Sequence, residues 1–297
     1  MKNLFYLFLV FLLVSCNSKE KKTIENVPAQ KQEPELMTEL YGSWVGDFTV
    51  LERDTARAIT EMHINKINIS IKKITASEVV ARSIVAGNNR PLTGKMTKKG
   101  NTIRFVLNEP GDDKNDGVFD FEIQNDTILT GTWTANNPKK EVTKRSFNLI
   151  KKEFRYNPYV MLPEEEIYID YQNPKAPEEK KERKEGEEIT DYDMDDSLYR
   201  VASESIMKLN SSTQQLKESD LKNLKKIDLE ILRNTIFARH GLTFKTKTIR
   251  QFFDQVEWYI PISGNVDNQL TAIEKQNIAI LKRFEKYATD NYDSIGR

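Results

Sequence analysis

A polar, acidic stretch in the middle of the chain limits most strongly what this chain can fold into. Residues 164–196 contain 14 Asp or Glu against 5 Lys or Arg, with few large apolar side chains between them. Such a segment cannot bury enough apolar surface to offset the entropy that is lost when a chain becomes ordered. The sequence therefore predicts two separate domains joined by an acidic linker at residues 157–197, and a length of 297 residues suits two domains of ordinary size.

The N-terminus has the composition of an export signal. Lys2 is followed by an unbroken apolar run at residues 4–14, which is shorter than the roughly 20 residues that cross a bilayer. The run ends in Leu-Val-Ser before Cys16, and this sequence resembles the lipobox of bacterial lipoproteins. The resemblance implies a signal peptide at residues 1–15 and a lipidated Cys16 as the mature N-terminus. An ordinary signal peptide and a short membrane anchor are the alternatives.

The lipoprotein resemblance implies a location as well as a modification. More than one acyl chain, such as palmitate, on Cys16 would hold the protein stably on a membrane of the bacterial cell envelope. Asn17, rather than an aspartate, follows the cysteine, which favours the outer membrane over the inner one. Residues 16–38 are polar and lack an apolar period, so we expect a disordered tether. Cys16 is the only cysteine, so the chain cannot form an intramolecular disulfide.

Residues 39–156 have the pattern of an antiparallel β domain. Short segments with alternating apolar residues are separated by turn-forming Gly, Asn and Asp, as at Gly87-Asn88-Asn89 and Lys99-Gly100-Asn101. An open sheet of this size would expose its edges, and closure removes them, so the sequence predicts an up-and-down β-barrel. The strand-like segments are residues 42–50, 62–74, 77–87, 91–99, 101–109, 117–125, 127–135 and 142–152.

Two short motifs of this region resemble lipocalin-like (calycin) barrels. Gly42-Ser43-Trp44 opens the first strand segment, and Gly131-Thr132-Trp133 repeats the Gly-x-Trp pattern near the end of the domain. In that family the first such tryptophan lies across the closed end of the barrel. The resemblance implies a cavity for a small apolar ligand, whereas a barrel of this size can equally be filled by its own side chains. Both interpretations stand at this point.

Residues 198–288 predict a small four-helix α-domain, followed by a tail at residues 289–297. Four segments begin with residues that commonly cap or start helices, and Gly241 stands where a helix ends in a left-handed residue. Thr271 and Glu274 have the spacing of a capping box. Together with the barrel this makes the fold class α+β in two domains. The expected helix starts are Ser219 or Asp220, Asp228, Thr246 or Thr248, and Thr271.

Several polar residues lie on the apolar faces of these helices. On a helical wheel, Arg233 and His240 fall beside the stripe of Leu229, Leu232 and Ile236. Arg239 lies at the other margin, and Asn277 sits inside the stripe of the last helix. Buried polar groups of this kind need partners, for which Asp254, Glu257 and Glu274 are the candidates. This arrangement predicts a hydrogen-bonded lock that sets how the helices cross.

The same residues resemble the YARHG domain of bacterial envelope proteins. The resemblance is carried by Arg233-Asn234, by Phe237-Ala238-Arg239-His240-Gly241, and by Phe244, Phe253, Trp258-Tyr259 and Pro261. Phe237 stands where the family has the tyrosine that gives the motif its first letter, so no hydroxyl chemistry is available there. The resemblance implies an extracytoplasmic protein that is secreted or attached to a membrane. It implies no activity, and it makes cell-wall material or an envelope protein the expected partner.

No complete catalytic constellation is present in the sequence, so we expect no enzyme activity. The two histidines, His63 and His240, lie in different domains, and the common nucleophile and phosphate-loop motifs are absent. Residues 112–123 fail the spacing of a calcium loop, so we expect neither a metal nor a cofactor, and a solvated hairpin tip at residues 112–117. The balance of 45 basic and 45 acidic residues gives no indication of nucleic-acid binding.

The sequence thus favours a lipid-anchored envelope protein that binds or scaffolds without catalysis. Two alternatives remain: a carrier of a small apolar ligand in the barrel, and a hydrolase in which His240 forms a general-base pair with Asp254 or Glu257. A ligand-contacting cluster would instead bind an anionic sugar or a peptide carboxylate. The candidate binding or structural residues are Arg233, Asn234, Arg239, His240, Trp258, Tyr259 and Asn277.

Overall fold

The structure is a computed structural model that describes residues 33–58, 60–100, 102–124, 126–164, 168–170 and 199–290. Apart from residue 33, these belong to one compact unit, Pro34–Arg297. The predicted signal peptide, Cys16 and most of the tether lie outside the described residues, as do most of the acidic linker and of the tail. No helix in the described ranges has the length and apolar character needed to cross a bilayer.

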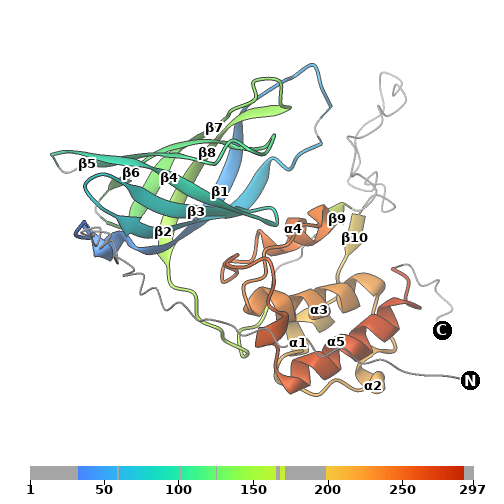
Figure 1. The fold of residues 1–297 in the computed structure, drawn as a ribbon. Helices are drawn as coiled ribbons and strands as arrows, with labels where there is room; N and C mark the ends of the chain where they lie inside the picture. Colours follow the sequence, from blue (N-terminus) through green and yellow to red (C-terminus); the bar gives the residue numbers. More distant parts are fainter. Residues whose placement is uncertain are drawn as a thin grey trace, which may run out of the picture. The chain divides into compact units, whose positions relative to one another are not determined.

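The N-terminal domain is a closed, antiparallel, up-and-down β-barrel of eight strands, as the sequence predicts (Figure 1). Each strand pairs with the next, and the last pairs with the first from Ser43↔Lys152 to Arg53↔Val142. The ring leaves no unpaired edge among the eight strands. The strands are β1 (Gly42–Arg53), β2 (Ile64–Ile74), β3 (Val79–Val85), β4 (Asn88–Lys99), β5 (Thr102–Asn108), β6 (Gly117–Gln124), β7 (Ile128–Ala135) and β8 (Val142–Lys152).

The inward-facing positions of the strands form a filled, aromatic core. Strict alternation is clearest in β5 and β6, where every second side chain is buried. Phe105 and Phe121 stack with ring centroids 5.0 Å apart, and Phe48 lies 6.3 Å from Phe119. These contacts show that much of the interior is occupied by the protein's own side chains.

One end of the barrel is closed by Trp44. This side chain is fully buried, and its indole nitrogen donates a hydrogen bond to the carbonyl oxygen of Leu40 at 3.0 Å. Leu40 belongs to the 3₁₀ helix η1 (Thr38–Leu40), which precedes the first strand. The first Gly-x-Trp motif therefore does what its lipocalin-like resemblance implies. Trp133, from the second motif, lies near the end of β7 and hence at the opposite end of the barrel.

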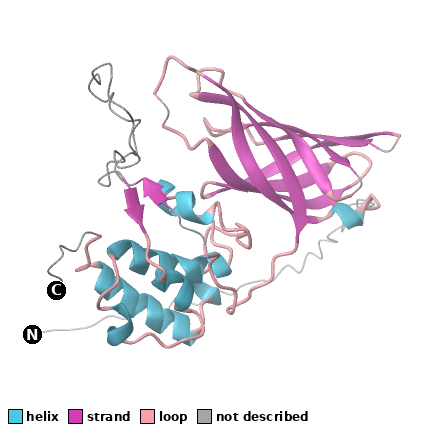
Figure 2. Cartoon of the chain, turned by 180° about the vertical axis from the view of Figure 1, so that it is seen from behind, coloured by secondary structure: helices cyan, strands magenta, loops and turns pink. Residues whose placement is uncertain are grey.

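The C-terminal part is helical, and the helices and barrel strands form separate groups (Figure 2). Its described residues contain five α-helices, one more than the four expected, because the one-turn α1 was not anticipated. Residues 168–170, inside the predicted linker, form a strand that pairs with residues 199–201. The elements are β9 (Tyr168–Asp170), β10 (Tyr199–Val201), α1 (Ser205–Lys208), α2 (Glu218–Leu221), α3 (Lys226–Arg239), α4 (Lys247–Phe253), the 3₁₀ helix η3 (Asp267–Gln269) and α5 (Ala272–Glu285).

The start of α5 and the end of α3 follow the sequence signals closely. Thr271 and Glu274 form the predicted capping box, in which the Thr271 backbone N–H donates to Glu274 Oε2 at 2.9 Å. Gly241 adopts a φ of +75° after α3, and the N–H groups of Gly241 and Leu242 bond to the carbonyls of Ala238 and Phe237. This pattern is a Schellman motif, which terminates the helix as predicted.

The start of α3 differs from the expectation. The helix begins at Lys226 rather than at Asp228, which is its third residue. Asp228 caps the helix from inside the first turn, since its carboxylate accepts from the Lys225 backbone N–H at 3.1 Å. The carboxylate also accepts from the backbone and hydroxyl of Ser203, and this second partner explains its complete burial. A similar shift occurs at α2, where Asp220 accepts from the Lys217 N–H.

Strand β2 is buried on both faces, which the alternating sequence did not indicate. Its inward side chains Ile67, Ile69 and Ile71 pack in the barrel core. The outward Lys66 and Asn68 are buried because the helical part covers them. Four of the bonds that join the two parts are called the seam. Lys66 Nζ donates to Val256 O and the Lys66 N–H to Asp254 Oδ2 (3.0 Å). Asn68 Nδ2 donates to Pro261 O (2.8 Å) and the Gly87 N–H to Thr243 Oγ1 (3.1 Å).

Candidate functional site

Arg233, the first residue of the predicted polar cluster, is held by an ion pair between the two long helices. Its Nε and Nη2 donate to the two carboxylate oxygens of Glu285 at 2.5 and 3.1 Å. In this bidentate geometry two N–H groups of the planar guanidinium bond to the two oxygens of one carboxylate. Glu285 lies on α5 and was not among the expected partners, so the assignment of Asp254, Glu257 or Glu274 to Arg233 was wrong. The neighbouring Asn234 donates to the carbonyl of Glu230 within α3.

His240 is buried and bonded to Glu274, one of its expected partners. The imidazole Nε2 lies 2.9 Å from Glu274 Oε2, and the residue is only 4 % exposed. The ring of Tyr156 stacks on the imidazole with centroids 4.2 Å apart, while the Tyr156 hydroxyl donates to Glu274 Oε1. Burial raises the pKa of Glu274, but hydrogen bonds from Thr271 and His240 outweigh it and leave the pKa lowered. Glu274 is therefore a charged acceptor that is fully surrounded by donors.

Arg239 binds a segment of the chain that the sequence analysis assigned to the linker. Its Nε and Nη2 donate to the carbonyl oxygen of Val160 at 3.0 and 2.7 Å, and its Nη1 donates to Ser212 Oγ. Burial lowers the pKa of Arg239 to about 10. With no carboxylate within ion-pair distance among the described residues, this guanidinium is held by neutral acceptors, including a backbone carbonyl.

We call residues 156–162 the strap, because they run over the helical domain and are bonded to it along their length. The Met161 carbonyl accepts from Trp258 Nε1 at 2.9 Å, and the Pro158 carbonyl accepts from Asn210 Nδ2 at 2.9 Å. Leu162 is buried in the helical core. Residues 157–162 thus belong physically to the helical part, although their sequence gives no periodic signal. Most of these bonds reach backbone carbonyls, which any residue type presents, so the sequence could not reveal them.

The remaining predicted residues are also satisfied internally. Tyr259 is almost fully buried and donates its hydroxyl to the carbonyl of Leu242 at 2.6 Å. Asn277 donates to the carbonyls of Ser211 and Gln214 and accepts from the Leu216 N–H at 3.0 Å. Arg239, His240 and Trp258 come together under the strap, whereas Arg233 and Asn277 make separate contacts. Most groups of the cluster are therefore bonded internally, although Arg239 and Trp258 also line a cavity of about 380 Å³.

A second polar region, which the sequence analysis missed, lies at the open end of the barrel. We call it the mouth: a cavity of about 440 Å³ opposite the end closed by Trp44. Its floor includes Phe48, Phe119 and Trp133, and Lys247 and Arg250 reach it from α4. The sequence did contain a signal for the mouth. In several strands the inward-facing positions are apolar along most of the strand, but the inward-facing position at this end of the barrel is polar. These residues are Asn65 in β2, Ser83 in β3, Glu109 directly after β5 and Arg145 in β8.

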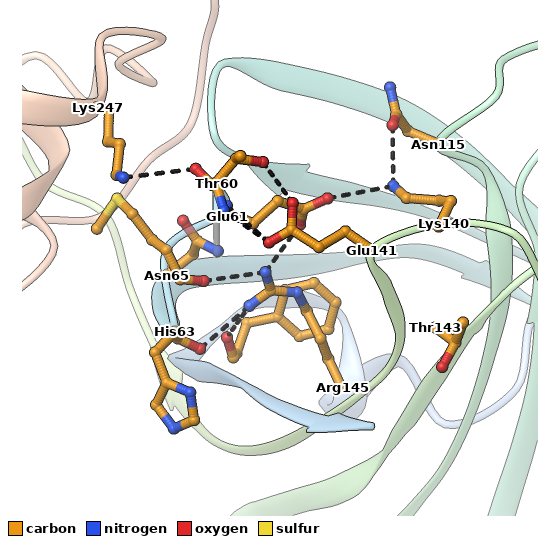
Figure 3. A network of polar contacts seen from close by, with 12 residues as sticks. Thr60, Glu61, His63, Asn65, Asn115, Lys140, Glu141, Thr143, Arg145 and Lys247 are labelled. Atoms are coloured by element: carbon orange, nitrogen blue, oxygen red, sulfur yellow. Dashed lines mark hydrogen bonds and ion pairs between the residues drawn. The ribbon is translucent and has the colours of Figure 1, made fainter. Parts of the chain in front are cut away.

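Arg145 organises one wall of the mouth (Figure 3). Its guanidinium is 3 % exposed and donates to Glu61 Oε2 at 3.0 Å and to the carbonyls of Phe48, Met62 and His63. Burial lowers the pKa of Arg145, while Glu61 raises it. These bonds fix the loop between β1 and β2 over the barrel. His63 contributes its backbone here, and its imidazole has no part in the bonds described.

The network continues around the rim to the helical domain (Figure 3). Glu141 accepts from the backbone N–H groups of Thr60 and Glu61 at 2.7 and 3.2 Å, and from the Thr60 hydroxyl. The Thr60 carbonyl in turn accepts from Lys247 Nζ at 3.4 Å. Lys247 thus links the rim to α4 by a long hydrogen bond, and Arg250 of the same helix donates to Asn65.

Acidic residues line the opposite wall. Asp116 is 2 % exposed, forms a bidentate pair with Arg90, and accepts from the N–H groups of Gly111 and Asp113. The expectation of a solvated hairpin tip at residues 112–117 was therefore wrong at Asp116, because the carboxylate folds the tip around itself. Burial raises the pKa of Glu109, whose carboxylate accepts from Ser83, Trp133 and the Gly117 N–H.

Within the described residues, no three His, Cys, Asp or Glu side chains lie close enough to hold a metal ion.

The fold and its polar clusters define a two-part protein, an eight-stranded barrel joined to a helical domain. The helical part is identified by a family comparison: residues 203–286 match the YARHG domain. No curated protein and no solved structure matches the chain. The chain therefore contains a YARHG domain, beginning a few residues after the predicted boundary at 198.

Proposed function

We propose that this protein is a lipid-anchored, non-catalytic binding or scaffolding module of the bacterial cell envelope. The observation that carries the proposal is the engagement of the YARHG side chains: Arg233, Arg239 and His240 are bonded to Glu285, the strap and Glu274. A general base must be able to reach a substrate proton, and a buried imidazole bonded to a carboxylate and stacked under a tyrosine ring is poorly placed for this. What supports the anchor is the lipobox-like sequence that ends in Cys16.

The mechanism is tethering. Lipid on Cys16 would fix the chain to a membrane, with the outer membrane favoured, and residues 16–38 would give reach. The bonds of the seam and the strap hold the YARHG domain to the barrel, so that the two would present one combined surface to cell-wall material or to an envelope protein.

The anchor is tested by metabolic labelling with a palmitate analogue in a bacterial host. We expect the native chain to carry label and to fractionate with outer membranes, whereas Cys16→Ser carries none and leaves the membrane fraction. Equal labelling of the two chains would refute the lipoprotein assignment.

The binding role is tested by co-sedimentation of the purified chain in detergent with isolated peptidoglycan and with outer-membrane extract. We expect retention on envelope material without release of soluble fragments from it. Fragment release that is lost in His240→Gln, but kept in His63→Gln, would favour the hydrolase alternative. Because the barrel core is occupied by aromatic side chains, the carrier alternative has support only at the mouth.

A further inference from the structure

The mouth has the size and shape of a small-molecule site. Its volume of about 440 Å³ falls within the roughly 300–1,000 Å³ that such sites occupy. Phe48, Phe119 and Trp133 give it an apolar, aromatic floor, with the rings of Phe48 and Trp133 5.9 Å apart. A floor of this kind suits a flat or apolar group.

The acidic groups of the mouth are already matched by donors. Asp116 is paired with Arg90, and Glu61 with Arg145 and more distantly with Lys140. Glu109 accepts three hydrogen bonds, and Asp113 accepts from the Asn115 N–H. In the described part of the chain, none of these carboxylates forms an ion pair with the two cations of α4.

Arg250 and Lys247, one turn apart on α4, are the cations lining the mouth that have no ion-pair partner among the described residues. Arg250 donates from Nη1 to the neutral amide of Asn65, and its buried Nε has no hydrogen-bond partner among the described residues. No carboxylate in the described part of the chain lies within ion-pair distance of its guanidinium. Lys247 makes the 3.4 Å bond to the Thr60 carbonyl, although an ammonium has three donors.

The positive charges of this wall also repel one another. The pKa of Arg250 is lowered, mainly by burial and also by the positive charge of Arg145. The carboxylate of Asp254, one turn further along the chain, acts in the opposite direction. A guanidinium that is largely buried beside a second one is costly, and an anion in the cavity that Arg250 and Lys247 line would offset the repulsion between the positive charges. This is the arrangement expected of a site that is completed by a ligand.

The geometry points to a binding site in the mouth for a small organic anion. Its carboxylate or phosphate head accepts hydrogen bonds from Arg250 and Lys247, and its apolar body lies on Phe48, Phe119 and Trp133. The site is composite, because the barrel supplies the floor and the YARHG domain supplies the cations of α4. Neither part forms it alone.

Isothermal titration calorimetry of the full chain in detergent at low salt tests the site. The probes are 3-phenylpropionate, its neutral analogue 3-phenylpropionamide, and phenyl phosphate. We expect at least one anion to bind at least about tenfold more tightly than the amide, a difference of about 1.4 kcal/mol. The better of the two anions identifies the head group. Equal binding of the amide, or no heat from any probe at millimolar concentration, overturns the proposal.

Three variants locate the site. Arg250→Gln is expected to weaken anion binding at least about tenfold, and Lys247→Met severalfold, since charged hydrogen bonds are the strong ones. Arg283→Gln, an exposed arginine on α5, is the matched control and should leave the affinity unchanged. Thermal unfolding establishes that each variant folds; if Arg250→Gln does not, Lys247→Met decides. Unchanged affinity in the folded variants contradicts the site.

Trp133 provides an independent readout of position. The chain contains three tryptophans, and Trp44 and Trp258 lie away from the mouth. Anion binding should therefore change the fluorescence of the native chain but not that of Trp133→Phe. A change that persists in Trp133→Phe places the anion elsewhere and overturns the assignment.

Discussion

The two polar regions of this protein differ in how completely their charges are matched. Under the strap, Arg239, His240 and Glu274 each have partners that use most of their hydrogen-bonding groups. At the mouth, within the described part of the chain, Arg250 keeps a buried nitrogen without a partner, and Lys247 has one long bond. A saturated cluster stabilises a fold, whereas an undersatisfied one has capacity for a ligand. The YARHG side chains thus have internal partners, and the cations of α4 are the better candidates for contact with a ligand.

The largest expected effect on stability comes from a substitution in the cluster under the strap. Glu274→Gln should lower the free energy of unfolding by about 3–5 kcal/mol, because it removes the charge that His240, Tyr156 and Thr271 all share in a buried site. Urea unfolding measures the change. Glu218→Gln, an exposed partner of Arg283, is the control and should cost under about 1 kcal/mol. A loss below about 1 kcal/mol for Glu274→Gln would mean that the cluster is not a structural lock.

At the seam, the buried Lys66 should make the free energy of unfolding depend on pH. Burial lowers the pKa of Lys66 to about 8 from an ordinary value of 10.5. Between these values the unfolded chain holds a proton that the folded chain has lost, so the free energy of unfolding should rise with pH. At about 1.4 kcal/mol per unit, the rise is on the order of 3 kcal/mol.

Urea unfolding between pH 8 and 10 measures this rise. Lys66→Met should remove it, while Lys72→Met, an exposed residue of the same strand, should keep it. The same pH slope in both variants would show that Lys66 is not the group responsible.

A smaller effect separates the stacking of Tyr156 from its hydrogen bond. Tyr156→Phe keeps the ring on His240 but removes the donor to Glu274, so we expect a loss of about 0.5–1.5 kcal/mol in thermal or urea unfolding. Tyr159→Phe, whose side chain is 75 % exposed, is the matched control and should be neutral. If the two variants behave alike, the strap is not fixed through the Tyr156 hydroxyl.

The smallest effect is expected at the mouth. Lys247→Met should change the free energy of unfolding by no more than about 0.5 kcal/mol, because the ammonium makes one long bond near the surface. Differential scanning calorimetry of native and variant chains checks this. A loss above about 1 kcal/mol would show that Lys247 supports the fold, and the contrast between the two regions would then fail.

Much of the fold could be predicted because its signals are local. Alternating apolar residues located the eight strands, and Trp44 was expected at the closed end. The turn between β3 and β4 was placed one residue late, since Ala86 and Gly87 both adopt positive φ. Part of the lock was predictable as well: Glu274 was a candidate partner for the half-buried His240. The bidentate partner of Arg233, Glu285, was missed because helix crossing decides which carboxylate of α5 it meets.

The sequence by itself determined the eight barrel strands, most of the helices, and that polar side chains must be buried on α3. These follow from periodicity and capping, which act over a few residues. The tertiary structure alone decided which partners the polar groups found. Arg239 bonds to Val160, 79 residues away, and Lys66 to Val256, 190 residues away. Backbone carbonyls at such distances look alike in a sequence, and only packing brings a particular one within hydrogen-bond reach.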